Sequence, residues 1–220
     1  MVLYSDIIAL LVEYKIKMPE QKIVQNLKDA KHFAHNRYPV VLKVLSKDIV
    51  HKSDRGVVAL GVADGKMLER KYRQIMKNAG KAKLEGVLVQ RMIDKGVEVI
   101  VGSKTDPQFG PTVLFGLGGI FVEIMKDYSL RIAPIKEKDG LEMMGELKSH
   151  QILDGARGQK GINKKALSQL LVNVSKMVSH YEIPQLDLNP VVCTPKSCTV
   201  VDARILGVEE IKHRRNKNNH

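Results

Sequence analysis

The 220 residues suffice for one large domain or for two small lobes that share a core. An apolar content of 44% with 27% charged residues is typical of a globular protein, and no apolar run is long enough to cross a bilayer. The first residues lack the basic segment of a secretory signal. Cys193 and Cys198 are too few for a disulfide framework, so we expect two free thiols in a cytoplasmic protein.

The net charge of +12 raises the question of nucleic acid as a partner. Part of that charge belongs to a basic tail, which we expect to be disordered from residue 211 to 220. Aromatic residues make up 5% of the chain, and none alternates with the basic runs to form a stacking platform. The composition therefore argues against nucleic acid and favours a basic surface that attracts small anions.

The first hundred residues predict helices at 5–14, 20–36 and 64–79. Ser5 and Asp64 are suitable caps for the first and third helices, and apolar residues recur at helical spacing in the second. Strands are predicted at 39–45, 57–62, 87–90 and 97–101.

The second half predicts a strand at 112–116 and helices at 138–147 and 164–181. A terminal hairpin follows, with arms at 185–192 and 199–205 around a turn at 194–197. Helices and strands in this order predict an α/β (α+β) layer fold. Since no long linker divides the chain, we expect two lobes with a cleft between them and a hinge at Gln90–Gly96.

Two residues of the first half are candidates for phosphate chemistry. Lys43 lies in an otherwise apolar strand, where an ammonium is costly unless it meets an anion or reaches solvent at the strand edge. His51 lies in a polar loop with Asp54, and imidazole can act as an acid, a base, a metal ligand or a phosphoryl acceptor. The simpler alternative for His51 is an exposed surface histidine.

Asn189 and Asp202 lie on opposite arms of the predicted hairpin. Such pairing lets an amide oxygen and a carboxylate face one another across neighbouring strands. Mg²⁺ prefers few protein oxygens together with phosphates and water, so the pair predicts a magnesium site. Asp187, two residues from Asn189, shares that face of the strand.

The segment from Asp106 to Pro134 combines an apolar strand, the glycine-rich loop Gly116–Gly119, two acids at Glu123 and Asp127, and Arg131. Glycines allow close approach of backbone to an anion or to a neighbouring strand. By itself, the segment fits either a phosphate loop or a buried strand that ends in a tight turn.

These pieces, in this order, resemble the ATP-grasp or β subunit of the ADP-forming (NDP-forming) acyl-CoA synthetases, within the succinyl-CoA synthetase superfamily. The resemblance covers roughly residues 4–208. The motifs that carry it are Tyr38-Pro39-Val40-Val41-Leu42-Lys43, Ser46 to Asp54, Gly96 to Gly102, Asp106 to Pro111, the glycine-rich segment, Gly155-Ala156-Arg157-Gly158, and Leu188-Asn189-Pro190 with Asp202.

The resemblance implies a single ATP-grasp domain over residues 1–210, with the nucleotide in the cleft between lobes 17–91 and 95–208. Helix 5–15 would pack on the second lobe or on a partner. The implied reaction is acyl-CoA + ADP + phosphate ⇌ carboxylic acid + CoA + ATP. A separate CoA-binding α subunit is implied as partner, in an α₂β₂ assembly without membrane contact.

The resemblance also implies roles for individual residues. Lys43 would contact nucleotide phosphate, and Glu98 would bind ribose or orient the nucleotide. Asn189 and Asp202 would hold Mg²⁺, while His51 would carry the phosphoryl group. The remaining implied nucleotide-binding residues are Gly56 and the hinge residues Gln90, Arg91, Met92 and Ile93; Asp187 or Asp54 would orient His51, and Glu123, Asp127 and Arg131 are secondary candidates.

The chain departs from the family pattern in its histidine loop. Arg55-Gly56-Val57 has one glycine where the family usually has two, and Gln185 replaces a common acid. The basic tail has no counterpart in the pattern. These departures leave open an alternative function, a catalytically silent ATP-grasp module that senses nucleotide within an acyltransferase or other complex.

Overall fold

The computed structural model describes residues 2–49, 55–119, 126–155 and 160–213. The chain divides into two compact units. The smaller unit comprises Leu3–Ser5 and Met18–Asp94, and the larger comprises Met1–Val2, Asp6–Lys17 and Lys95–His220. Within the described ranges, no helix combines the length and the apolar character needed to span a membrane.

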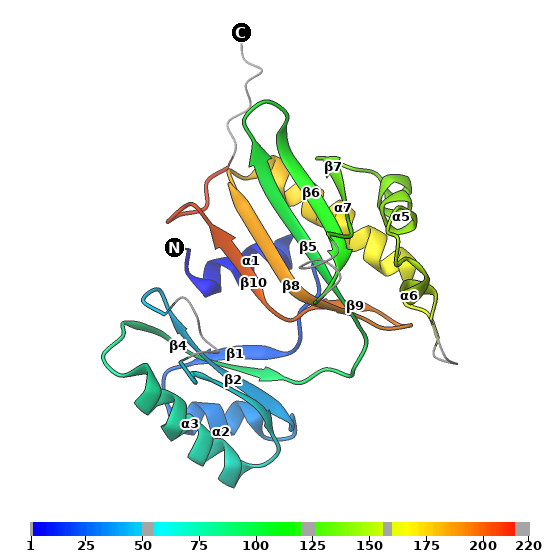
Figure 1. Cartoon of the computed structure of the whole chain (residues 1–220). Helices are drawn as coiled ribbons and strands as arrows, with labels where there is room; N and C mark the ends of the chain where they lie inside the picture. The colour runs from blue at the N-terminus through cyan, green and yellow to red at the C-terminus, as the bar shows by residue number, and fades with distance from the viewer. Residues whose placement is uncertain (1, 50–54, 120–125, 156–159, 214–220) are drawn as a thin grey trace. The chain divides into compact units, whose positions relative to one another are not determined.

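The smaller unit is a four-stranded antiparallel sheet in the order β1-β4-β2-β3 (Figure 1). Helices α2 and α3 pack against it. Its elements are β1 (Gln21–Val24), α2 (Leu27–Ala34), β2 (Val40–Ser46), β3 (Val58–Val62), α3 (Gly65–Ala79) and β4 (Leu84–Arg91).

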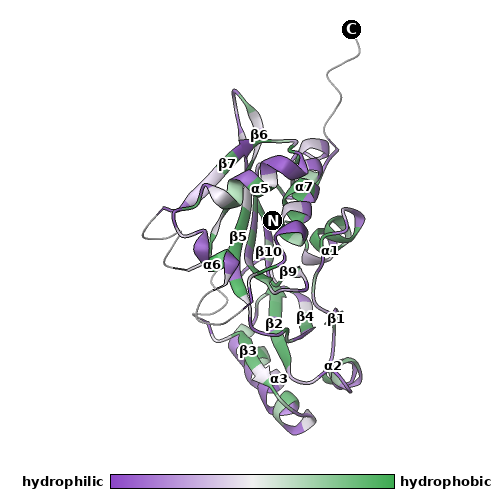
Figure 2. Cartoon of the chain, turned by 90° about the vertical axis from the view of Figure 1, so that its right-hand side faces the viewer, coloured by the Kyte–Doolittle hydropathy of each residue, from purple (hydrophilic) through white to green (hydrophobic). Residues whose placement is uncertain are grey.

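The core of the smaller unit lies between its sheet and its helices. Every residue of β2 is buried, and α3 contributes Leu68, Tyr72 and Ile75 to the same cluster. Figure 2 accordingly shows β2 and β4 largely in the hydrophobic colour. Asp64 caps α3, as expected, by accepting a hydrogen bond from the Met67 N–H at 2.8 Å.

The helix expected over 20–36 is wrong in its first half. Residues Gln21–Val24 form an edge strand that pairs with β4, Gln21 opposite Gln90 and Val24 opposite Val87. The helix begins only after Asn26, whose side chain caps it by accepting from the Asp29 N–H. Ile23 and Val24 fit either period, and pairing with a long neighbouring strand outweighs the local helical pattern.

The larger unit is a six-stranded antiparallel sheet. Its main path is β10-β8-β5-β6-β7, and β9 also pairs with β8. The strands are β5 (Val97–Asp106), β6 (Gly110–Leu117), β7 (Tyr128–Ile132), β8 (Gln185–Cys193), β9 (Cys198–Val200) and β10 (Ala203–Leu206). The helices are α1 (Tyr4–Glu13, from Asp6 onward in this unit), α5 (Glu137–Gly145), α6 (Gln151–Asp154) and α7 (Lys164–His180).

Helix α7 covers one face of this sheet, and its buried side includes Leu167, Leu171 and Val174 (Figures 1 and 2). Along β5 the buried residues Val99, Val101 and Ser103 alternate with more exposed ones. The more exposed set therefore points to the opposite side of the sheet, which we call the open face. The predicted α/β class is confirmed, since both units combine antiparallel sheets with helices.

Two differences concern the second half of the chain. The arm expected at 199–205 is two strands, because Val201 and Asp202 interrupt the ladder between β9 and β10. Strand β7 and the short helix α6 were not predicted. The sequence of β7 alternates Tyr128, Leu130 and Ile132 with Ser129 and Arg131, and its three apolar residues are about half exposed.

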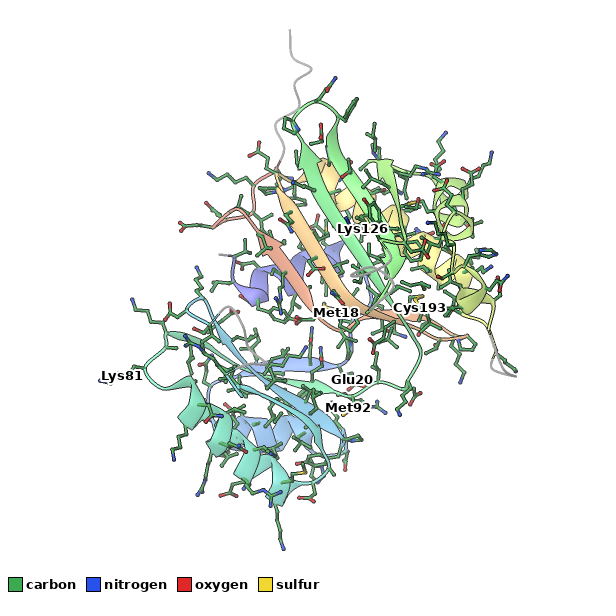
Figure 3. The ribbon with its side chains drawn as sticks, viewed as in Figure 1. Met18, Glu20, Lys81, Met92, Lys126 and Cys193 are labelled. Atoms are coloured by element: carbon green, nitrogen blue, oxygen red, sulfur yellow. A yellow bond between two sulfur atoms is a disulfide. The ribbon has the colours of Figure 1, made fainter. Side chains whose placement is uncertain are left out.

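The expectation of two free thiols is wrong. Cys193 and Cys198 face one another across the pair β8–β9 and form a disulfide, with their Cα atoms 4.1 Å apart. Figure 3 labels Cys193 at this turn. Two cysteines that flank a four-residue turn become direct cross-strand neighbours once the hairpin closes, which an overall cysteine count does not reveal.

Asp127 joins the chain before β7 to the turn before α6. Its carboxylate, 4% exposed, accepts hydrogen bonds from the Lys148 N–H at 2.9 Å and the Ser149 N–H at 3.0 Å. Burial alone would raise the pKa of Asp127, but these N–H groups favour the charged form more strongly, and the pKa lies below its ordinary value. The carboxylate therefore stabilises this corner of the larger unit.

We expect Asp127→Asn to lower the free energy of unfolding by about 2 kcal/mol at pH 7, because one buried backbone N–H loses its acceptor. A group with a depressed pKa stabilises the fold above its unfolded pKa and loses that effect as pH falls through its folded pKa. The difference from the wild type should therefore shrink below about pH 4. Urea unfolding at several pH values measures this difference in the free energy of unfolding. The control is Glu182→Gln, at an exposed position.

Candidate functional site

Lys43 is held in the middle of the smaller unit's sheet. It lies in β2, opposite Leu88 of β4 and Val58 of β3, and it is 9% exposed. Since β2 is an inner strand of its sheet, the alternative that Lys43 reaches solvent at a strand edge does not apply. The backbone of Lys43 is held on both sides by paired strands.

His51 and Asp54 lie outside the described residues, and the residues that flank them make hydrogen bonds to neighbouring elements. Before it, Ser46 donates to the Lys83 carbonyl at 2.7 Å, and Asp48 accepts from the Lys83 N–H at 2.8 Å. After it, the Gly56 carbonyl accepts from the Asn78 side chain at 2.8 Å. The residues on either side of 50–54 are thus held by the turn before β4 and by α3.

The single glycine of this loop is required by its conformation. Gly56 has φ +63°, and a Cβ there would lie 2.9 Å from the Asn78 side-chain nitrogen. The next residue, Val57, is fully buried in the core of the unit, and its carbonyl accepts from the Val44 N–H. A side chain in place of a second glycine therefore fixes the end of the loop to the core.

The expected hinge residues begin within β4. The Gln90 side chain is 1% exposed and donates to Gln21 at 2.7 Å, and Arg91 forms an ion pair with Glu20 at 3.2 Å. The Met92 N–H donates to the Pro39 carbonyl at 3.0 Å, while Ile93 is half-buried. Figure 3 labels Glu20 and Met92 at this edge of the unit. The side chains of Gln90 and Arg91 are thus engaged within the unit.

The remaining primary candidates lie in the larger unit. Glu98, exposed near the start of β5, points to the open face together with Ile100, Gly102 and Lys104. Asp187 lies directly opposite Gly102 on β8, so its side chain shares that face. The open face therefore brings together acids that are far apart in the sequence.

Asn189 and Asp202 are cross-strand partners, as the sequence predicts. The pairs Arg204–Asp187 and Val200–Val191 share one register, which sets Asn189 opposite Asp202, and the Asn189 N–H donates to the Asp202 carbonyl at 3.2 Å. Asp202 also forms an ion pair with Arg204 at 3.5 Å. An amide oxygen and a carboxylate thus project side by side from one hairpin.

The donor set suits Mg²⁺ bound together with phosphates. In the described part of the chain, no three His, Cys, Asp or Glu side chains gather closely enough to hold a metal by themselves. Burial raises the pKa of Asp187, the nearby Asp202 carboxylate raises it further, and Arg204 opposes both. Carboxylates that repel one another in this way would be relieved by a bound cation, so the residues fit a magnesium–nucleotide site.

A pocket of about 510 Å³ lies beside Asp187 on the open face. Its polar lining includes Lys104 and Asp187, and Gly102 leaves backbone exposed to it. Its apolar lining includes Leu114 and Leu130. The pocket is large enough for part of a ligand or for a short peptide segment.

The secondary candidates divide. Asp127 is occupied by backbone N–H groups, and Arg131 pairs with Glu146, which also accepts from Ser129. The Arg131 hydrogen bond lowers the pKa of Glu146, and Glu146 raises that of Arg131. The ion pair between Arg131 and Glu146 thus holds β7 against the end of α5. Glu123 lies outside the described residues.

Sequence reasoning gave no individual role to two residues of this site. Arg204 lies across from Asp187 and beside Asp202, so it is the cation nearest both acids by register. Once Asn189 is set opposite Asp202, the alternation of side chains along the hairpin places Arg204, two residues further on, on the same face and opposite Asp187. Gly118 donates its N–H to the Glu98 carbonyl at 2.8 Å, a contact that a glycine-rich pattern does not locate.

Comparison with known proteins shows the family to which the chain belongs. The ATP-grasp domain family model matches residues 3–206. The β subunit of acetate–CoA ligase [ADP-forming] I from Pyrococcus furiosus is 45% identical over 199 residues, covering 88% of this chain and 86% of that protein. The acetate–CoA ligase [ADP-forming] I of Archaeoglobus fulgidus is 46% identical, but the chain spans only 30% of its length.

A solved structure has the same fold. Dinucleotide-forming acetyl-coenzyme A synthetase 1 of Ca. Korarchaeum cryptofilum, in complex with coenzyme A and Mg-AMPPCP, matches with a TM-score of 0.79 and 39% identity. The match covers 89% of this chain and 87% of that one. The chain therefore belongs to the ATP-grasp family and, within it, to the β subunits of the ADP-forming acetate–CoA ligases.

Proposed function

We propose that this chain binds Mg-ADP or Mg-ATP and transfers a phosphoryl group between a histidine and ADP. With its partner it would catalyse acyl-CoA + ADP + phosphate ⇌ carboxylic acid + CoA + ATP. The observation that carries the proposal is the hairpin that sets Asn189 opposite Asp202 on the face that also bears Glu98. Two oxygen donors beside an acid suited to ribose form the protein's share of a magnesium–nucleotide site.

Each remaining residue has a task in this proposal. Lys43 neutralises nucleotide phosphate, and its buried strand position keeps the ammonium in place. Glu98 accepts hydrogen bonds from ribose hydroxyls. The backbone of residues 90–93 reads the adenine edge, and Gly56 brings the end of the histidine loop close to phosphate. Bound Mg²⁺ would offset the charge that develops on the transferred phosphoryl oxygens.

His51 is the proposed phosphoryl carrier. In the direction of ATP formation, a phosphate oxygen of ADP attacks phosphorus, the P–N bond to imidazole breaks, and the nitrogen keeps the electron pair. In reverse, the neutral imidazole attacks the terminal phosphorus of ATP, and ADP leaves. Asp187 is the acid we propose to orient the imidazole, with Asp54 as the alternative, because Asp187 borders the pocket on the open face.

The partner would be a CoA-binding α subunit. The A. fulgidus relative is more than three times as long as the segment matched here, whereas the P. furiosus relative is named as a β subunit of similar length. We therefore propose that this chain supplies the nucleotide half of a two-subunit enzyme, assembled as α₂β₂. The Korarchaeum structure, in which a phosphohistidine segment points towards the nucleotide-binding site, supports a shuttling histidine.

We expect His51→Asn to abolish acid-labile, base-stable labelling of the chain by [γ-³²P]ATP and Mg²⁺, because the amide cannot form a phosphoramidate. Calorimetric binding of Mg-ADP should change less than about three-fold, since the ligands of the nucleotide remain. Exposed His32 of α2 provides the matched control, and His32→Asn should label as the wild type does. Acid-labile label that persists in His51→Asn would remove His51 from the mechanism.

We expect Asp202→Ala to weaken Mg²⁺-dependent ADP binding by more than about ten-fold, because one oxygen ligand and its charge are lost. Asp154→Ala is a suitable control, since Asp154 is also an acid of the larger unit with one ion pair, to Lys164. Titration calorimetry with and without EDTA measures both. An affinity in Asp202→Ala equal to that of the control would refute the metal-binding role.

A further inference from the structure

Strand β5, which carries Glu98, lies between β6 and β8 (Figure 1). On one side it pairs with Val192 of β8. On the other side the ladder β5–β6 runs to the pair Val99–Leu117, which brings the next residue, Gly118, opposite Glu98. The Gly118 N–H donates to the Glu98 carbonyl at 2.8 Å. The backbone that carries the Glu98 carboxylate is thus fixed by β8 and by the end of β6.

The space beside Glu98 is narrow at position 118. A Cβ built there would lie 3.1 Å from the Glu98 carbonyl oxygen, 3.3 Å from its carbonyl carbon and 3.3 Å from its Cβ. These distances are shorter than ordinary contacts, so one of the two residues would have to move by a few tenths of an ångström. A hydrogen-bonding geometry tolerates little such movement.

The requirement at Gly118 is for space and not for backbone conformation. Gly119, the next residue, has φ +63°, which favours glycine for conformational reasons, whereas Gly118 has no positive φ. Alanine at 118 would therefore suit the local backbone dihedrals, and the cost of its methyl group would come from the close contacts with Glu98.

Glycine at 118 also keeps the surface beside the carboxylate bare. Residues opposite one another in an antiparallel pair project to the same face, so a side chain at 118 would stand next to Glu98 on the open face. Gly116 and Gly102, paired with Ile100 and Leu114, likewise lack side chains on this face. Glycines within strands commonly mark a place where a ligand approaches the backbone closely.

We propose that Gly118 is a positioning residue for nucleotide binding, which sets the Glu98 carboxylate for the ribose hydroxyls and leaves room for the sugar. The inference rests on the proposed function, because it assigns Glu98 to the ribose of the bound nucleotide. It gives the glycine-rich segment a specific task, which is to place an acid on the neighbouring strand and not to hold phosphate.

The test compares ADP with 2′,3′-dideoxy-ADP, both with Mg²⁺, by calorimetry. In the wild type, a carboxylate that accepts from ribose hydroxyls should favour ADP by about ten-fold or more. Gly118→Ala should lose most of this preference. The matched control is Gly145→Ala at the end of α5, where a Cβ meets nothing within 4 Å, and it should keep the preference.

A double-mutant cycle separates positioning from general damage. Glu98→Ala should remove the preference for ADP, and Gly118→Ala in that background should cause no further loss. Losses that add in the double variant would overturn the inference. If the wild type does not bind Mg-ADP, the proposed function itself fails. If the wild type discriminates and Gly118→Ala discriminates equally well, only the inference about Gly118 fails.

A measurement on the unmodified protein covers the case in which Gly118→Ala does not fold. In protein labelled with ¹⁵N-glycine, the Gly118 amide should shift on addition of Mg-ADP and shift much less with the dideoxy nucleotide, because it bonds to the residue that contacts ribose. The Gly145 amide should not respond to either. Equal shifts of Gly118 with both nucleotides would contradict the proposed link to the ribose.

Discussion

The constraint on which the candidate site depends is the common register of β8 with β9 and β10. One alignment places Cys193 against Cys198, Val191 against Val200 and Asp187 against Arg204. The same alignment leaves Asn189 and Asp202 opposite one another where the ladder is interrupted. Since a slip of one residue would turn these side chains to the other face, the buried residues of the hairpin maintain the geometry that we propose for metal binding.

The sequence predicts this hairpin well because it is local. Its arms are joined by a short turn, so alternation along each arm is enough to pair Asn189 with Asp202. The sequence also marks Lys43 as a candidate, since a charged residue within an apolar strand is costly to bury. The strand at Gln21–Val24 was misassigned because only its partner β4, more than sixty residues away, decides between strand and helix.

Other features depend on contacts that no local pattern contains. The engagement of Asp127 with the Lys148 and Ser149 N–H groups is decided by how the chain returns before α6. Gly118 is one of several glycines in its segment, and only the approach of β5 distinguishes it from Gly119. In both cases the residue type was noticed in the sequence, but its partner came from tertiary packing.

The open face carries Glu98, Asp187 and Asp202, although the chain as a whole is strongly basic, with a net charge of +12. The two scales of charge act at different distances. On the proposed function, the overall positive field would attract a nucleotide polyanion from solution, whereas the acids would repel free phosphate at close range. A nucleotide that arrives without its cation would meet that local barrier, so the charge distribution would favour binding of the magnesium complex.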